Sequence, residues 1–284
     1  MTCLLTLVDG SAYTPSVCDH AAWAAKRLSL PAELVHALGH REEPAAPSDF
    51  TGSLDADAQD RLLAELAELD ARKAKLEHQR GRLVLDSAKV RLEQAGVAHV
   101  APRLRNGDVL EAVQDLGGKA ALIVIGKRGE AADFATLHLG SNLERVVRAT
   151  SRPVLVASRA FQPVTRFLIA FDGGPSAIKA VEEIAGGPLL RDLPGQLLMA
   201  GTPAPAARDR LDQAMERLRG AGFAVEARVE AKPPEEVIAQ AMDHNPAGLL
   251  IMGAYGHSRI RSLIIGSTTT AMIRSVKAPV LLFR

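Results

Sequence analysis

Cysteine is scarce in this chain of 284 residues, which holds only Cys3 and Cys18. Two cysteines are too few for a disulfide framework or a cysteine metal cluster. No uninterrupted apolar run approaches the ~20 residues that a membrane-spanning helix needs. The apolar stretch 3–8 meets Asp9 without a basic leader, which predicts a first strand rather than a signal peptide. We therefore expect a cytoplasmic protein with no membrane partner.

An excess of charge of one sign is also missing. The chain has 34 Lys and Arg against 33 Asp and Glu, a formal net charge of +1. Surfaces that bind nucleic acid are usually basic, so we expect no nucleic-acid partner. The composition, 47% hydrophobic and 24% charged, is typical of a globular protein with a substantial core, and the length favours two domains.

Several catalytic motifs are absent from the sequence. There is no Gly-x-x-x-x-Gly-Lys-Ser/Thr P-loop, no Gly-x-Gly-x-x-Gly after a first strand and no Gly-x-Ser-x-Gly elbow. These absences argue against a P-loop ATPase, a dinucleotide-dependent dehydrogenase and an α/β-hydrolase. His36 and His40 are four residues apart but straddle a predicted strand end, where that spacing does not bring two rings together. We expect no metal site there.

Short apolar segments alternate with amphipathic helical segments along the whole chain. The expected strands are 3–8, 33–38, 97–104, 120–125 and 153–157, then 166–171, 196–200, 223–229, 248–252 and 279–283. Such alternation predicts an α/β fold in which a parallel sheet is covered by helices on both faces.

The order of elements repeats, and the spacing of matching residues shows how. Gly140 and Gly266 lie 126 residues apart, whereas Asp9 and Asp172 lie 163 apart. The first half therefore holds 37 additional residues, which we place in a proline-rich loop and a long helix within 45–94. We expect two tandem domains, 1–160 and 164–284, the first carrying this helical insertion.

The long helix is expected over 54–94, with an interruption at Gly81. Its leucines recur on one side, at Leu62, Leu66, Leu69, Leu76 and Leu83. One interpretation is an arm that binds a partner. The other is a helix that packs its leucines on its own sheet and turns its charges to water, and we favour this second interpretation.

The most informative motif is Gly253-Ala254-Tyr255-Gly256, then nine residues, then Gly266-Ser267-Thr268. It follows the apolar strand 248–252 and leads into a helix. Glycines let the backbone approach a ligand, and the N–H groups that open a helix have no intrahelical partners. The motif therefore predicts an anion site, where Arg259 and Arg261 of the intervening residues can pair with phosphate oxygens.

With these motifs the sequence resembles the universal stress protein family in its tandem form, over nearly all of its length. The resemblance implies two tandem α/β domains, each a five-stranded parallel sheet with helices on both faces, Rossmann-like and similar to the adenine nucleotide alpha hydrolases. It also implies that the final strands meet between the domains, through 154–157 and 280–283, as in a dimer of the family. A homodimer of the whole chain is a further expectation.

In ATP-binding members of this family the glycine-bounded loop holds phosphates and ribose, the first-strand Asp contacts the nucleotide, and the end of the second strand faces the adenine. Carried over to this sequence, and with Arg259 added from its charge, the site comprises Asp172, Ala200, Gly253, Gly256, Arg259, Gly266, Ser267 and Thr268. In an open parallel sheet this set would gather beyond the carboxyl ends of the strands, at the switch in strand order.

The first half carries a weaker copy of the same site. Its candidates are Asp9, Gly126, Gly129, Gly140, Ser141 and Asn142. Here the gap is ten residues long and contains Glu130 and Asp133 but no Lys or Arg. Two acids beside a triphosphate would repel it, and Lys127 and Arg128 upstream offset this only in part. We expect the nucleotide mainly in the second half.

These inferences together predict a stress-response protein that binds ATP, alone or with Mg²⁺ on its phosphates, and acts as a sensor or adaptor rather than an enzyme. Its protein partner is not identifiable from sequence. Two alternatives stay open: an adaptor of the same fold that binds no nucleotide, and an ATP hydrolase of low turnover.

Overall fold

The computed structural model describes residues 2–39, 56–127, 141–245, 248–254 and 266–284. The first half of the chain alternates strands and helices in the order β1 (Cys3–Leu7), α1 (Thr14–Leu28), β2 (Ala32–Ala37), α2 (Ala56–Gln94), β3 (Val100–Arg105), α3 (Val109–Leu116), β4 (Ala120–Gly126), α4 (Ser141–Ala149) and β5 (Val154–Ala157), with a short 3-10 turn before β4.

The second half repeats this order. Its elements are β6 (Arg166–Ala170), α5 (Pro175–Gly186), β7 (Gly195–Ala200), α6 (Pro205–Gly220), β8 (Val225–Glu230), α7 (Pro234–Asp243), β9 (Gly248–Gly253), α8 (Ser267–Ser275) and β10 (Val280–Phe283). No helix in the described part of the chain is long and apolar enough to span a membrane.

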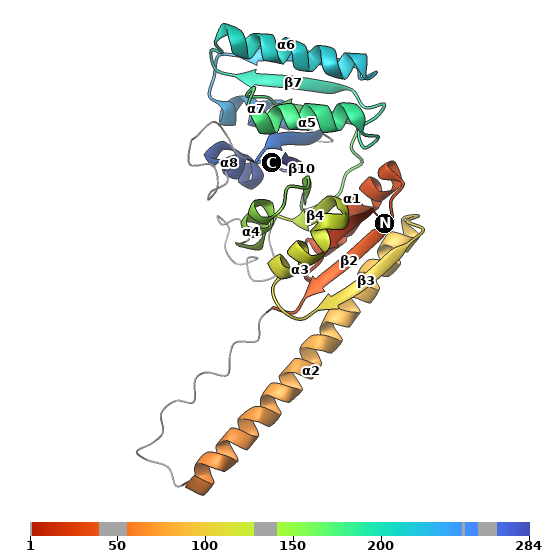
Figure 1. The fold of residues 1–284 in the computed structure, drawn as a ribbon, viewed down its shortest axis with the longest axis vertical. Coiled ribbons are helices and arrows are strands. Elements are labelled where there is room, and N and C mark those ends of the chain that lie inside the picture. Colours follow the sequence, from red (N-terminus) through yellow and green to blue (C-terminus); the bar gives the residue numbers. More distant parts are fainter. Residues whose placement is uncertain (1, 40–55, 128–140, 246–247, 255–265) are drawn as a thin grey trace.

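All ten strands form one sheet in the order β3-β2-β1-β4-β5-β10-β9-β6-β7-β8. Within each half the neighbouring strands are parallel, as the alternation of strands and helices predicts. The halves join where β5 and β10 pair antiparallel, with Leu155 opposite Leu281. The expected meeting of the two final strands is thus confirmed, and the chain contains an internal pseudo-dimer (Figure 1).

Hydrogen bonds across this joint are donated by a side chain from each half. Arg27 Nε of α1 donates to the carbonyl oxygen of Leu189 at 2.6 Å, and Lys179 Nζ of α5 donates to that of Ser151 at 3.2 Å. Each contact links a charged side chain of one half to the backbone of the other. These bonds add to the β5–β10 pairing that joins the halves.

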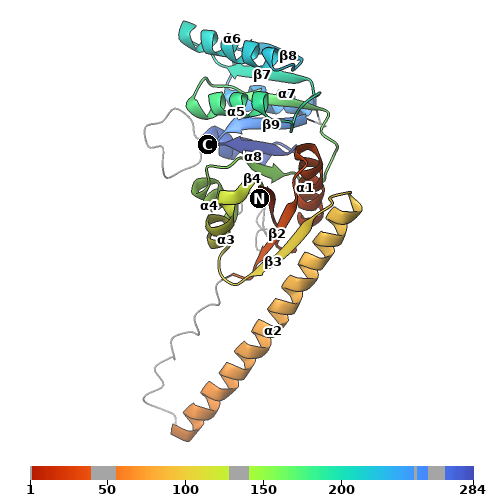
Figure 2. The same ribbon diagram turned by 45° about the vertical axis from the view of Figure 1, so that its right-hand side comes forward.

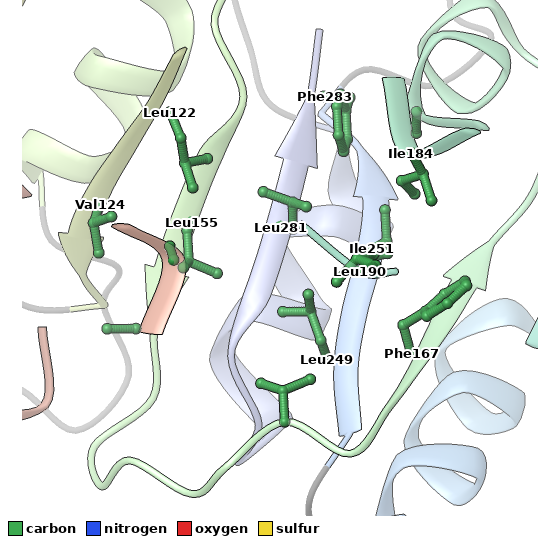
Figure 3. Packing of buried hydrophobic residues seen from close by; sticks show 14 of the residues in the cluster. Leu122, Val124, Leu155, Phe167, Ile184, Leu190, Leu249, Ile251, Leu281 and Phe283 are labelled. Carbon is green, nitrogen blue, oxygen red and sulfur yellow. The ribbon is translucent and has the colours of Figure 1, made fainter. Parts of the chain in front are cut away.

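Helices cover both faces of the sheet, which explains why its inner strands are nearly continuous apolar runs. One core contains buried residues of α1, α2, α5 and α6, and the other contains buried residues of α3, α4, α7 and α8. Successive residues of a strand alternate between the two, as Leu281 and Leu282 of β10 do. The first core runs across the joint without interruption, from Leu155 to Ile251 (Figure 3).

Helix α2 differs from both sequence expectations. It runs without a break from Ala56 to Gln94, so the expected interruption at Gly81 is wrong. A Cβ added at Gly81 would lie 2.6 Å from Leu104 Cδ1 and 2.9 Å from His36 Cδ2, so the glycine lets the helix pack closely on β2 and β3.

The favoured interpretation of the leucines of α2 is also wrong. Leu62, Leu66, Leu69, Leu76 and Leu83 are exposed, with 36 to 69% of their surface accessible. The helix is anchored instead by residues nearer its end: Gly81, Leu85, Ala88 and Leu92. The rest of α2 projects beyond the body of the protein (Figures 1 and 2).

Candidate functional site

The sheet of the second half reverses its strand order between β6 and β9, since β7 and β8 continue on one side and β10 on the other. Ala170 of β6 lies opposite both Met252 of β9 and Leu198 of β7. Asp172, Gly253 and Ala200 follow these residues by one or two positions, so the three lie at one edge. This is the edge at which open α/β sheets bind ligands.

Asp172 is held in a tight turn directly after β6. Its Oδ1 accepts a hydrogen bond from the N–H of Gly174 at 2.8 Å, and Gly173 between them has φ +71°. Only glycine adopts that conformation without strain. The carboxylate is exposed at the edge of the sheet, where a ligand of the switch point can reach it.

Gly253 ends β9 where the backbone passes close to α5. A Cβ at this position would lie 2.9 Å from the Cβ of Ser176, so a larger residue would push the two elements apart. The glycine is thus required for close packing of β9 on α5 at the switch point.

Helix α8 is tied to the end of β9 by two hydrogen bonds. Thr269 Oγ1 donates to the carbonyl oxygen of Gly253 at 2.9 Å, and the N–H of Gly266 donates to that of Ala254 at 3.1 Å. The first turn of α8 therefore stands beside Gly253. Gly256 and Arg259 of the predicted site lie between these anchors, outside the described residues.

The start of α8 presents polar groups toward the same edge. Ser267 is exposed and Thr268 is partly buried. The N–H groups of a helix's first turn have no intrahelical acceptors, and the helix dipole places partial positive charge there. Gly266, which precedes the helix, has φ −53° and ψ 142°, values open to any L-residue.

Two further residues reach this site from distant parts of the sequence. Arg210 of α6 donates through Nη1 to the carbonyl oxygen of Gly173 at 3.2 Å, so its guanidinium stands beside the Asp172 turn. Glu235, in the first turn of α7, accepts from Thr268 Oγ1 at 2.6 Å. The sequence motif signals neither residue, because both come from helices outside it.

The first half repeats the turn but not its surroundings. Asp9 Oδ1 accepts from the N–H of Ser11 at 3.0 Å, and Gly10 has φ +78°, which matches the turn at Asp172. Gly10 faces Val84 of α2, however, where Gly173 faces Arg210. Val84 and Arg210 are 126 residues apart, the spacing of the repeat, so a cation in one copy is replaced by an apolar residue in the other.

The remaining candidates of the first half are only partly described. Gly126 ends β4, and Ser141 and Asn142 open α4, with Asn142 exposed. Gly129 and Gly140 lie outside the described residues. Lys127, expected to offset nearby acids, is buried and donates through Nζ to the carbonyl oxygen of Val276 in the second half. Its charge is therefore directed at the joint between the halves.

Two other features lie apart from this edge. His36 Nδ1 is 2.8 Å from the carbonyl oxygen of Val8, and the described residues contain no group of three or more His, Cys, Asp or Glu that could hold a metal ion. His40 lies outside the described residues. A hollow of about 840 Å³ opens between α7 and β6–β8, lined mostly from the amino ends of these strands, opposite the predicted site.

Fold and site together define a tandem α/β protein with Gly253 and the start of α8 at a switch point of the sheet. A sequence model of the universal stress protein family matches residues 4–158 and 188–284, and the chain belongs to this family in its tandem form. It is 39% identical over 284 residues to Universal stress protein Slr1230 of Synechocystis sp., covering 99% of each chain.

Solved structures share the fold over the full length at lower identity. A universal stress protein of Archaeoglobus fulgidus is similar with a TM-score of 0.68 and 19% identity, covering 99% of this chain and 96% of that one. A putative universal stress protein of Pseudomonas aeruginosa has a TM-score of 0.58 and 15% identity, with 100% and 93% covered. At these identities the likeness supports the tandem fold.

Proposed function

We propose that this chain is a cytoplasmic stress-response protein that binds ATP in its second half and acts as a sensor or adaptor. The observation that carries the proposal is the gathering of Asp172, Gly253 and the first turn of α8 at one edge of the sheet. A backbone that a ligand can approach, unpaired N–H groups and a helix dipole favour a phosphate there.

The second half is favoured over the first because of its charges. Arg210 stands beside the Asp172 turn, and a guanidinium can pair with two phosphate oxygens at once. In the first half the matching position is Val84, and Lys127 is directed at Val276. The first half is the weaker candidate.

Glu235 fits a nucleotide best when Mg²⁺ accompanies it. A carboxylate 2.6 Å from Thr268 Oγ1 would repel bare phosphates. Mg²⁺ is commonly held by one or two carboxylates together with substrate phosphates, and Glu235 can supply such a ligand. We therefore expect ATP to bind more tightly with Mg²⁺ than with EDTA.

Calorimetric titration of ATP into the purified protein tests the proposal, together with mass spectrometry of small molecules that co-purify. Gly266→Glu adds a carboxylate beside the opening of α8 without backbone strain. Two like charges ~4 Å apart repel by about 4 kcal/mol at an effective dielectric constant of ~20, roughly three decades in Kd. We expect at least a ~100-fold loss of affinity.

Gly140→Glu, the same change in the first copy of the motif, is the matched control and should leave the affinity unchanged. If Gly140→Glu abolishes binding and Gly266→Glu does not, the site lies in the first half. No binding by wild type at millimolar ATP would favour the adaptor that binds no nucleotide.

The low-turnover hydrolase is distinguished by its product. Asp172 already accepts a hydrogen bond from its own turn, a binding and structural use of the carboxylate. A sensor should return bound ATP intact after an hour at 37 °C, whereas a hydrolase should release ADP in a single-turnover assay. ADP formation that Gly266→Glu removes would establish the hydrolase.

A further inference from the structure

The projecting part of α2 is a helix with few other described residues around it. Every described side chain from Asp60 to Lys73 is exposed. The helix meets the body through Gly81, which faces β2 and β3, and Val84, which faces the turn at Gly10. Before these contacts it stands away from the sheet in both ribbon views (Figures 1 and 2). We name residues 60–80 the arm.

An apolar stripe with a strict repeat runs along the arm and continues past it. Leu62, Leu69, Leu76, Leu83 and Val90 follow one another every seven residues, and they are 36 to 69% exposed. Leu66, 48% exposed, widens the stripe within the arm. A seven-residue repeat keeps one edge of a helix apolar along its length, and paired helices cover such edges against each other.

The stripe faces away from the protein's own body. Leu83 and Val90 belong to the anchored part of α2, yet they are 69% and 50% exposed. The residues that touch the body there are on another side of the helix: Gly81, Leu85, Ala88 and Leu92. Even where α2 packs on the sheet, the stripe is therefore exposed.

The charges along the arm change sign, and this restricts the kind of partner that can pair with it. Between positions 60 and 70 four acids stand against Arg61 alone, namely Asp60, Glu65, Glu68 and Asp70. Between positions 71 and 84 five bases stand against Glu77 alone, namely Arg72, Lys73, Lys75, Arg80 and Arg82. The change of sign falls beside Leu69, near the middle of the apolar stripe of the arm.

We propose that the arm pairs with the arm of a second copy of this chain, as an antiparallel two-helix coiled coil. Antiparallel pairing places the acidic half of each arm against the basic half of the other. Parallel pairing would set acid against acid and base against base, and flanking charges of this kind determine the orientation of paired helices. The same pairing covers the leucine stripe on both copies.

Sedimentation equilibrium of the full chain tests this pairing. We expect wild type to form dimers at tens of micromolar and the double variant Leu69→Glu/Leu76→Glu to be monomeric, with unchanged circular dichroism because both side chains are exposed. Ala71→Glu is the control for position: it adds one glutamate two residues from Leu69, about 200° around the helix. It should remain dimeric.

Three results would overturn the proposal. They are a monomeric wild type, a dimer that survives Leu69→Glu/Leu76→Glu, and a control that dissociates as readily as the stripe variant. The first removes the partner, the second moves the interface elsewhere, and the third makes the effect one of charge alone.

Charge exchange tests the orientation. One variant makes the basic half acidic, with Arg72, Lys73 and Lys75 changed to Glu. The other makes the acidic half basic, with Glu65, Glu68 and Asp70 changed to Lys. Each alone should be monomeric above the wild-type dissociation constant, and an equimolar mixture should form a heterodimer. If each variant alone dimerises as wild type does, the antiparallel arrangement is wrong.

Discussion

Gly81 offers a sensitive test of how α2 is attached to the sheet. Replacing a helical glycine with alanine normally stabilises a helix by about 1 kcal/mol, because glycine loses more backbone entropy on folding. At this position the added Cβ would lie 2.6 Å from Leu104 Cδ1, 2.9 Å from His36 Cδ2 and 3.0 Å from Leu38 Cδ2. In Gly81→Ala the gain in helix propensity is therefore opposed by the close contacts of the added Cβ.

We expect the cost of the close contacts to exceed the gain in helix propensity. Overpacking a well-filled site costs about 1–3 kcal/mol. The His36 ring cannot move aside easily, because its Nδ1 lies 2.8 Å from the Val8 carbonyl oxygen and the residue is buried. Subtracting the helix gain, Gly81→Ala should lower the free energy of unfolding by about 1 kcal/mol.

Leu104→Ala provides the means to refute this reasoning, because it removes the atom that the new Cβ would meet first. In that background Gly81→Ala should be neutral or stabilising, so the two changes should couple by about 1 kcal/mol in a double-mutant cycle. Guanidinium unfolding followed by circular dichroism at 222 nm measures all four proteins. Strictly additive effects, or a stabilising Gly81→Ala in the wild-type background, would show that α2 is not packed as closely as described.

Two further predictions concern buried titratable groups. His20 is fully buried beside Phe161, and burial lowers its pKa, so protonation is easier in the unfolded chain. Stability should therefore fall as pH drops below about 6.5, and His20→Leu should flatten the pH profile of unfolding between pH 7 and 5; an unchanged slope would contradict this. Burial raises the pKa of the Cys18 thiol to about 12, so Cys18 should react with Ellman's reagent at pH 8 only after denaturation.

The inner strands were predictable because they are buried on both faces. The run 120–125 predicts β4 almost to the residue, since such a strand must be apolar at every position. Strand ends in polar sequence were less well placed: the third strand was expected over 97–104 and β3 spans Val100–Arg105. The exposed pattern of β3 gives no continuous apolar run to mark its ends.

Helix α2 shows which information the periodicity of a sequence does not contain. A seven-residue repeat identifies which side of a helix is apolar, but it does not say whether the protein itself covers that side. Here the body is contacted by a mixed set that includes Gly81 and Ala88, whose small side chains give a weak signal in sequence. The stronger pattern, the leucines, is the one left exposed.

The candidate site was predictable where its residues belong to one motif or follow from the repeat. Gly253 and the opening of α8 are close in sequence, and Asp172 follows from matching the two halves. Arg210 and Glu235 were missed because helices far along the chain carry them to the edge. Lys127 was misjudged for a related reason: its acceptor, the Val276 carbonyl, belongs to the other half.

The two halves differ most in the helix that follows their second strand. In the second half α6 begins at Pro205, a residue suited to a helix start, and Arg210 then reaches the turn at Gly173. In the first half the matching helix has no proline and continues backward from Val84 to Ala56, through residues of high helix propensity. The same position in the fold thus supplies a cation to a ligand edge in one copy and the root of a projecting arm in the other. Under the two proposals, the halves have different functions: the second half binds the nucleotide, and the inserted helix of the first half binds a second copy of the chain.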